Sequence, residues 1–155
     1  FVILYRSVRF QVHGILKTYS ATERILFSYS GLTLFIKIII PLLLLYPPMM
    51  EAVHYIRHLV VGFIHLLMLG TISGSLLLFA MRSGWLNISS YGIRFSSYLL
   101  IIGFTLTEIL LLLQGLSIYM GWPLVPYYPF LLFCASIVLS VAVLLLFIFS
   151  FIPGD

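Results

Sequence analysis

The sequence predicts an all-α membrane protein, a polytopic bundle of four transmembrane helices with an amphipathic interfacial helix in front of them. Of the 155 residues, 63% are hydrophobic and 8% are charged, and the mean hydropathy is +1.21. A soluble domain carries about a quarter charged residues and about half apolar ones, so this chain has too little polar surface to fold in water. The single cysteine, Cys134, cannot form an intrachain bridge, which excludes a disulfide scaffold.

Four apolar stretches are long enough to cross a bilayer, because about 20 residues at ~1.5 Å rise span ~30 Å of hydrocarbon. They cover residues 25–46, 55–81, 97–121 and 127–152. Prolines at several of their ends favour helix termination, since proline cannot continue a helix. The Ser20-Ala-Thr-Glu23 pattern is typical of a capping box and predicts a helix start there. We therefore expect one transmembrane domain over residues 20–155.

Residues 1–19 predict a basic helix that lies in the interface rather than crossing the membrane. Its basic side chains recur at spacings of three, four and four, at Arg6, Arg9, His13 and Lys17. These spacings place them on one helical stripe, with apolar residues on the other side. Such a helix rests on anionic lipid headgroups, with Arg6, Arg9 and Lys17 as the lipid contacts. The alternative is the end of a preceding membrane span.

The charges between the spans predict the topology. Arg82 and Arg94 lie between the second and third spans, on the same side as the basic N-terminal segment. The segment over residues 122–126, on the opposite side, carries no charge. The positive-inside rule therefore places both termini on the cytoplasmic or matrix side of a bacterial or mitochondrial inner membrane.

Three ionisable residues fall inside the predicted spans, where a charge costs several kcal/mol and is a functional candidate by default. Helix rise places Lys37 and His65 roughly 13 Å, and Glu108 roughly 20 Å, from the non-cytoplasmic side. We expect the three to converge in the bundle interior, with Glu108 and Lys37 as proton-relay candidates. The alternatives are a structural polar cluster, or a Lys37 that extends to the surface.

Histidines lie along one side of the second span. His54, His58 and His65 differ by four and seven residues and share a helix face. Imidazole ligates haem and metal ions, so His58 and His65 are haem candidates, and all three are metal candidates. A bis-histidine haem needs a ligand from a second helix, and no other span contains histidine. The competing interpretation is that His54 and His58 are ordinary residues of the membrane edge.

Two further patterns concern helix packing. Gly70 and Gly74 form a small-residue motif that permits close helix approach. Thr107, Gln114 and Ser117 share one face of the third span, distinct from the face that carries Glu108. A helix with two polar faces is expected to be buried on both sides.

Two stretches resemble known proteins. The stretch RHLVVGFIHLLMLG, residues 57–70, resembles a His-Leu-x-x-Gly-Phe span of haem-copper-oxidase-like membrane proteins, including the nitric-oxide-response family. The stretch TEILLLLQGL, residues 107–116, is similar to a span of uncharacterised polytopic proteins of Bacteroidetes. The resemblance implies the C-terminal part of a larger helical protein, with His58 or His65 as haem or metal contacts and Glu108 and Lys37 in a proton path. It departs from the family pattern, because the oxidase centre takes histidines from several helices.

These observations favour a membrane-integral component of a redox or proton-handling, respiratory-type assembly. Expected partners are the lipid bilayer with anionic headgroups and other membrane subunits or a missing N-terminal part, and not nucleic acid. A non-catalytic scaffold subunit is the main alternative, and a small ion or metabolite transporter ranks last. The sequence has no nucleotide loop, no paired carboxylates and no clustered cysteine ligands, which argues against a conventional enzyme of soluble substrates.

Overall fold

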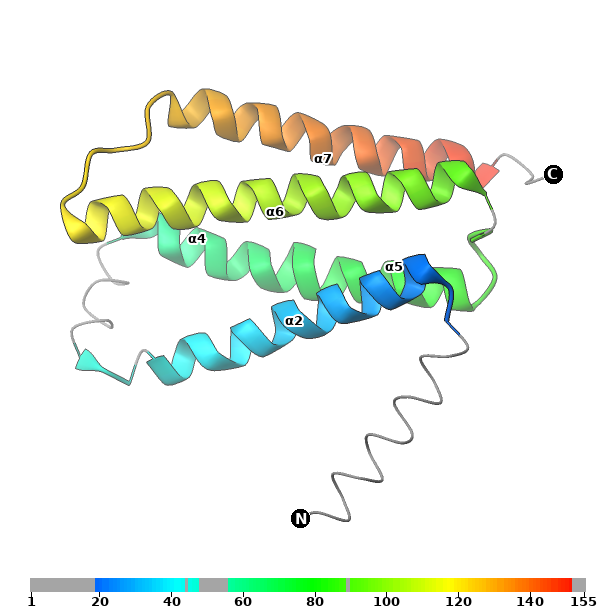
Figure 1. The fold of residues 1–155 in the computed structure, drawn as a ribbon, viewed down its shortest axis with the longest axis horizontal. Coiled ribbons are helices and arrows are strands. Elements are labelled where there is room, and N and C mark those ends of the chain that lie inside the picture. The colour runs from blue at the N-terminus through cyan, green and yellow to red at the C-terminus, as the bar shows by residue number, and fades with distance from the viewer. Residues whose placement is uncertain (1–18, 44, 48–55, 89, 152–155) are drawn as a thin grey trace, which may run out of the picture.

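The computed structural model describes residues 19–43, 45–47, 56–88 and 90–151, and within them the chain forms helices and no strand. The elements are α2 (Ala21–Leu43), α4 (Arg57–His65), the π-helix η1 (Leu66–Ser73), α5 (Gly74–Arg82), α6 (Tyr91–Met120) and α7 (Tyr128–Phe151). The segments α4, η1 and α5 follow one another without a break and form one rod (Figure 1). The predicted helix over residues 1–19, with Arg6, Arg9 and Lys17, lies outside the described residues apart from Tyr19.

Four helices of 22 to 30 residues are long and apolar enough to cross a membrane, which makes the chain an integral membrane protein. The expected four-span all-α bundle is confirmed. Helix α2 begins at Ala21, so the helix start predicted from the capping box is confirmed, four residues before the apolar stretch that begins at residue 25. Helix α6 differs from expectation: it begins at Tyr91 rather than residue 97, because its first turns extend beyond the apolar stretch that marks a span.

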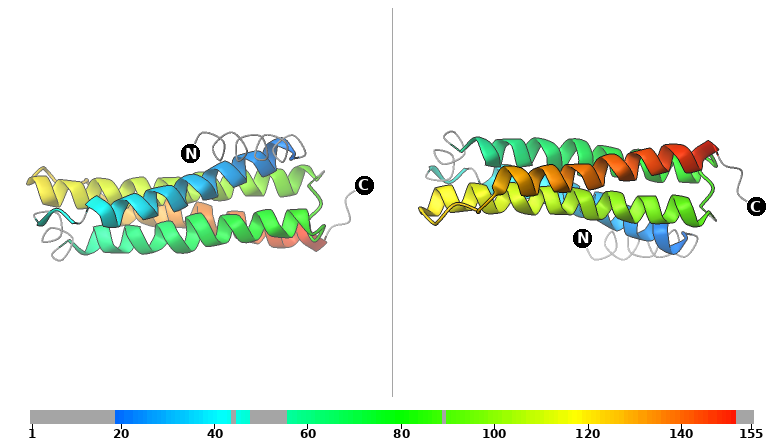
Figure 2. Two further views of the ribbon diagram at one scale, coloured as in Figure 1. Left: turned by 90° about the horizontal axis from the view of Figure 1, so that it is seen from below. Right: turned by 90° about the horizontal axis from the view of Figure 1, so that it is seen from above.

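Consecutive spans run in opposite directions, and the bundle is long and shallow (Figures 1 and 2). Helix α6 lies in the middle, with α7 along one side and α4 and η1 along the other. Its buried residues include Thr107, Gln114 and Ser117. Its buried glycines approach both neighbours, Gly103 at Leu139 of α7 and Gly115 at Leu59 of α4, so the expectation that this helix is buried on both sides is confirmed. Helix α2 crosses α5 and η1 where it begins and departs from α4 toward its other end (Figure 1).

Small residues set the closest approaches between these helices. A Cβ atom on Gly70 would lie 2.9 Å from Thr33 Cγ2 and 3.1 Å from Phe104 Cζ. A Cβ atom on Gly74 would collide with the Ser30 hydroxyl. The Gly70–Gly74 motif thus acts in packing: it lets α2 lie directly on η1 and α5, with Gly70 at the junction of three helices.

The π-helix in the second span has no counterpart in the sequence prediction. Two hydroxyl groups donate to carbonyls five residues back, from Thr71 to Leu66 (3.5 Å) and from Ser73 to Met68 (3.0 Å). This five-residue spacing matches the widened turn of a π-helix. Such segments inside α-helices occur often at functional sites, and this one begins directly after His65.

Candidate intramembrane site

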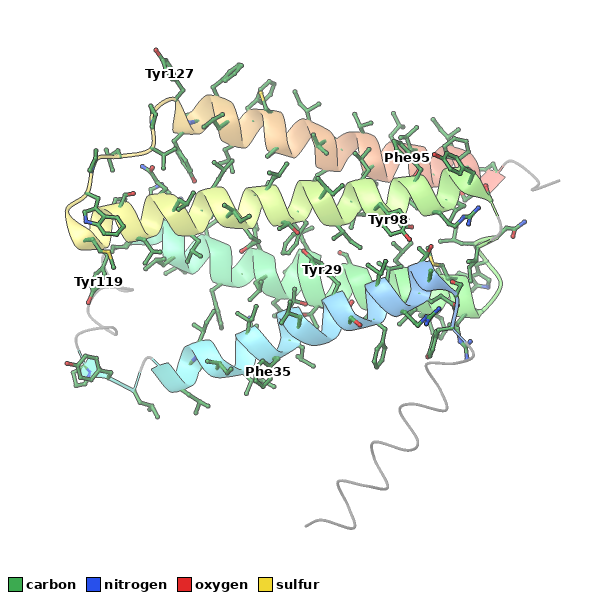
Figure 3. All side chains as sticks on the ribbon, viewed as in Figure 1. Tyr29, Phe35, Phe95, Tyr98, Tyr119 and Tyr127 are labelled. Atoms are coloured by element: carbon green, nitrogen blue, oxygen red, sulfur yellow. The ribbon has the colours of Figure 1, made fainter. Side chains whose placement is uncertain are left out.

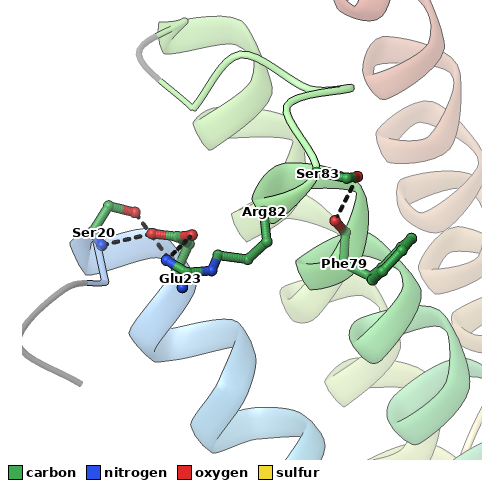
Figure 4. Close-up of polar contacts among 5 residues, drawn as sticks. All are labelled: Ser20, Glu23, Phe79, Arg82 and Ser83. Atoms are coloured by element: carbon green, nitrogen blue, oxygen red, sulfur yellow. Dashed lines mark hydrogen bonds and ion pairs between the residues drawn. The ribbon is translucent and has the colours of Figure 1, made fainter. Parts of the chain in front are cut away.

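One acid of the bundle is fully engaged near the beginning of α2. The carboxylate of Glu23 accepts the Ser20 backbone N–H at 2.7 Å, and the Glu23 N–H donates to the Ser20 hydroxyl at 3.3 Å. Its other oxygen lies 3.9 Å from the Arg82 guanidinium (Figure 4). The predicted capping box is therefore confirmed, and it also ties α2 to the end of α5.

Glu108 lies in the middle of α6 in a different environment. Its Oε1 atom is buried and has no hydrogen-bond partner among the described residues. Its other oxygen packs against α4, where a Cβ atom on Gly62 would lie 3.6 Å from it. A buried polar oxygen without a partner costs about 1–3 kcal/mol and calls for an explanation.

His65, on the neighbouring span, is the second polar group of this kind. Its Nδ1 atom is buried and unpartnered within the described part of the chain. The residue ends α4 and directly precedes the π-helix. Glu108 and His65 are thus two titratable side chains, on adjacent helices, that each keep an unused hydrogen-bonding atom inside the bundle.

The helix register places the three intramembrane ionisable residues at one level. Thr33, Gly70 and Phe104 meet at the junction of α2, η1 and α6. About four residues after this junction, α2 reaches Lys37 and α6 reaches Glu108. The second span runs in the opposite direction, so the same level there falls about four residues before Gly70, at the His65–Leu66 step. The expectation that Glu108 lies deeper than the other two is therefore wrong, because helix offsets cannot be read from span ends.

The Lys37 side chain contacts an aromatic ring rather than the Glu108 carboxyl group. Its ammonium lies 3.7 Å from the ring centroid of Phe63, a cation–π contact on the α4 side. Glu108 packs at Gly62, the residue next to Phe63. Across the described residues the ion pair that forms is Arg82–Glu23, so Lys37 and Glu108 do not form one. A proton-relay role for Lys37 stays a prediction.

One pair of hydroxyl groups, between α2 and α6, lies about one helical turn from Glu108. The Tyr29 hydroxyl shares a hydrogen bond of 3.2 Å with Thr105, one turn before Glu108 on α6, and lies within electrostatic range of the carboxyl. The Tyr29 ring also packs edge-on against Phe104 (5.9 Å between centroids), and Figure 3 labels Tyr29 on α2. The sequence places Thr105 on the Glu108 face, but no signal within one helix could assign Tyr29 to it.

The two described histidines of the second span, His58 and His65, have different surroundings. His58 packs edge-on against Tyr128 of α7, with 5.4 Å between ring centroids. His58 and His65 are seven residues apart on one helix face, so they cannot take opposite axial positions on one iron. His54 lies outside the described residues, and the described ones contain no group of three His, Cys, Asp or Glu side chains placed to hold a metal ion. Haem or metal binding by these histidines therefore stays a prediction.

Comparison of the chain with protein-family models, with curated protein sequences and with solved structures found no match.

Proposed function

We propose that this protein is a membrane-integral component of a redox or proton-handling assembly of respiratory type, in which Glu108 carries a proton within the bilayer. The observation that supports the proposal is the buried Oε1 atom of Glu108, in the middle of α6, which has no hydrogen-bond partner among the described residues. A carboxyl group that only held helices together would be expected to use its oxygens in hydrogen bonds.

His65 is the second proton-carrying residue in this proposal. Its buried Nδ1 atom lies on the adjacent helix at about the level of Glu108, where the π-helix begins. Imidazole can accept and release a proton near neutral pH, so His65 is the candidate acceptor or donor for the Glu108 proton. No direct hydrogen bond joins the two side chains among the described residues, so a water or a partner group completes the transfer.

The proposal includes a location and an orientation. We place the chain in a bacterial or mitochondrial inner membrane with both termini on the cytoplasmic or matrix side. The supporting observation is that Arg24, Arg82 and Arg94 occur together at the end of the bundle where α2 and α6 begin and α5 ends. The haem-copper-oxidase-like resemblance remains part of the proposal, with any haem ligated jointly with another subunit.

Infrared difference spectroscopy of the purified chain in lipid vesicles tests the proton-carrying role. We expect a pH-dependent band from a protonated carboxyl group that shifts when H2O is replaced by D2O and disappears in Glu108→Gln. Glu23→Gln is the matched control, since it removes the other described glutamate. A carboxyl band that neither titrates nor exchanges, or one that persists in Glu108→Gln, contradicts the proposal.

His65 can be tested with the same readout. We expect His65→Gln to slow or abolish the D2O shift of the Glu108 band, because the proton loses its neighbouring relay group. His58→Gln is the matched control, since it lies on the same helix face against Tyr128 and away from the Glu108 level. Identical exchange in both variants removes His65 from the proposal.

A scaffold subunit remains the second candidate, and hydroxyl pairs between helices favour it. Thr33 and Thr71 are 3.1 Å apart, and Thr22 and Tyr98 are 3.3 Å apart, which fixes helix packing without any chemistry. Absence of proton exchange at Glu108, together with a reduced-minus-oxidised optical spectrum free of haem bands, would favour this alternative. A transporter has less support, because α2 continues through Pro41 to Leu43 rather than breaking.

A further inference from the structure

Two threonine hydroxyls face each other where α2 packs on the second span. Thr33 Oγ1 lies 3.1 Å from Thr71 Oγ1, and Thr33 is only 3% exposed. Thr33 is also placed to donate to the Ser30 carbonyl of its own helix, at 3.0 Å. Thr71 is likewise placed to donate to the Leu66 carbonyl, at 3.5 Å. Three hydrogen-bond contacts therefore involve this one pair of hydroxyls.

The pair has too few protons to satisfy all three contacts. Each threonine hydroxyl carries one proton, and the two oxygens need one of the two protons between them. Either Thr71 donates to Thr33 and Thr33 donates to the Ser30 carbonyl, or Thr33 donates to Thr71 and Thr71 donates to the Leu66 carbonyl. The first arrangement points toward the end of the bundle where α2 begins, and the second points toward His65. A hydroxyl pair that can reverse in this way is able to pass protons along its length.

A buried polar atom without a partner lies beyond each end of the pair. Ser30 Oγ, one turn before Thr33 on α2, has no hydrogen-bond partner among the described residues, and Ser30 is only 6% exposed. On the other side, Thr71 contacts the carbonyl of Leu66, the residue next to His65 and its buried Nδ1 atom. The three hydroxyls therefore form a line that starts at the level of His65 and extends about 10 Å toward the beginning of α2.

An apolar layer closes this line of hydroxyls at the Ser30 end. Leu26, one turn before Ser30 on α2, is completely buried in a cluster with Met81 of α5 and Ile93 of α6. Side chains of α7 pack against the same cluster, so all four spans contribute to the layer. None of its side chains can donate or accept a proton. The hydroxyl line thus ends inside the bundle, before it reaches the headgroup side.

We propose that Ser30, Thr33 and Thr71 relay protons between the Glu108 site and the end of the bundle where α2 begins, and that the apolar layer is the barrier that closes this path. The inference rests on the proposed function, because it gives the Glu108 proton a route. In each passage one proton binds to one oxygen of the threonine pair, and the proton that this oxygen held moves to the other oxygen, which releases its own. Water molecules link the pair to His65 and to Ser30.

The rate of hydrogen exchange at the Glu108 carboxyl tests the path. The full chain in lipid vesicles is transferred from H2O to D2O, and the shift of the infrared band that Glu108→Gln removes is followed in time. We expect Leu26→Asn, which brings a polar side chain of similar size into the barrier, to accelerate the exchange about tenfold. Leu26→Ala is the control, because an apolar cavity stays dry, and it should change the rate far less.

The decisive comparison combines the opened barrier with the loss of one hydroxyl. Leu26→Asn together with Thr71→Val should exchange at the wild-type rate, because the line is broken. Leu26→Asn together with Ser73→Ala should keep the acceleration. Ser73 is the matched position, since its hydroxyl also donates to a carbonyl five residues back in η1 but does so on an exposed face. Thr71→Ser, which keeps the hydroxyl, should keep the acceleration as well.

The outcomes separate the relay from the proposed function. Equal acceleration in the Thr71→Val and Ser73→Ala double variants means that water enters without the hydroxyls, and it overturns the relay. No acceleration in a folded Leu26→Asn also overturns it, and Met81→Gln, which keeps the side-chain length, replaces that variant if it does not fold. A Glu108 band that exchanges in the wild type and at the same rate in every variant overturns the relay alone. A band that exchanges in no variant overturns the proposed function and the relay with it.

Discussion

Two glutamates inside the same bundle have opposite environments. Glu23 is only 3% exposed, yet both of its oxygens have partners, a backbone N–H and the Arg82 guanidinium. Glu108 lies in the middle of α6, a helix long and apolar enough to cross a membrane, and its buried Oε1 atom has no partner among the described residues. The first carboxylate caps the start of α2 and connects that helix to α5. The second is held in place by packing against Gly62 without a bond that fixes its charge state.

This difference separates a structural acid from a candidate functional one. Bonds to a carboxylate hold it in one protonation state and one position, which suits helix capping. A buried carboxyl without a hydrogen-bond partner raises the free energy of the fold and leaves an oxygen available for a proton donor or acceptor, which suits proton transfer. The comparison therefore predicts changes in stability of opposite sign at the two sites.

The largest expected loss of folding stability follows from forcing α2 and α5 apart at the end of the bundle where Glu23 lies. Gly74→Val should destabilise the chain by about 3 kcal/mol, because the added carbons collide with Ser30 and push α2 away from α5. Unfolding in a denaturing detergent, followed by tryptophan fluorescence, measures this loss. The matched control is Gly31→Val, since a Cβ atom on Gly31 meets nothing within 4 Å. Equal losses in both variants would mean that the α2–α5 contact is not tight.

Removing the engaged carboxylate should have the next largest effect. Glu23→Ala should cost about 1–2 kcal/mol, because the Ser20 N–H loses its acceptor and the helix start loses its reciprocal bond. Arg82→Gln should cost much less, since the Arg82 side chain is 46% exposed and such ion pairs contribute little. The same unfolding assay measures both variants. A larger loss in Arg82→Gln than in Glu23→Ala would show that the ion pair, not the cap, holds this end.

The comparison predicts the reverse sign at Glu108. Glu108→Leu should stabilise the bundle by about 1 kcal/mol, because an apolar side chain removes the buried unpartnered oxygen while it fills a similar volume. The unfolding assay again gives the measurement, with Glu23→Leu as the control that should destabilise. A clear loss of stability in Glu108→Leu would show that Glu108 has a structural partner, and the contrast between the two acids would fail.

The sequence was sufficient for the parts of this molecule that depend on local pattern. The number of spans, the capping box at Ser20 and the close packing at Gly70 each follow from a few neighbouring residues and their physical chemistry. The membrane simplifies this task, because every spanning segment must satisfy its own backbone and is therefore helical.

The sequence could not supply what depends on the offset between helices. Helix rise placed Glu108 deeper than His65, whereas the junction at Gly70 brings both to one level. Nothing within the first span indicated that Tyr29 would reach Thr105, since the two residues are 76 positions apart. The π-helix was also missed, because its widened turn rests on packing and on hydroxyl bonds rather than on a residue such as proline.

The smallest expected effect tests whether Tyr29 belongs to the Glu108 environment. Tyr29→Phe should cost about 0.6 kcal/mol, the average for one hydrogen bond between membrane helices, because it breaks the pair with Thr105. Thr22→Val breaks the other hydroxyl pair between α2 and α6, with Tyr98, and should cost a similar amount. The two variants should differ in the infrared band of the Glu108 carboxyl, which Tyr29→Phe shifts and Thr22→Val leaves unchanged. If neither variant moves the band, Tyr29 acts in packing alone, and the polar environment of Glu108 is restricted to the α4 side.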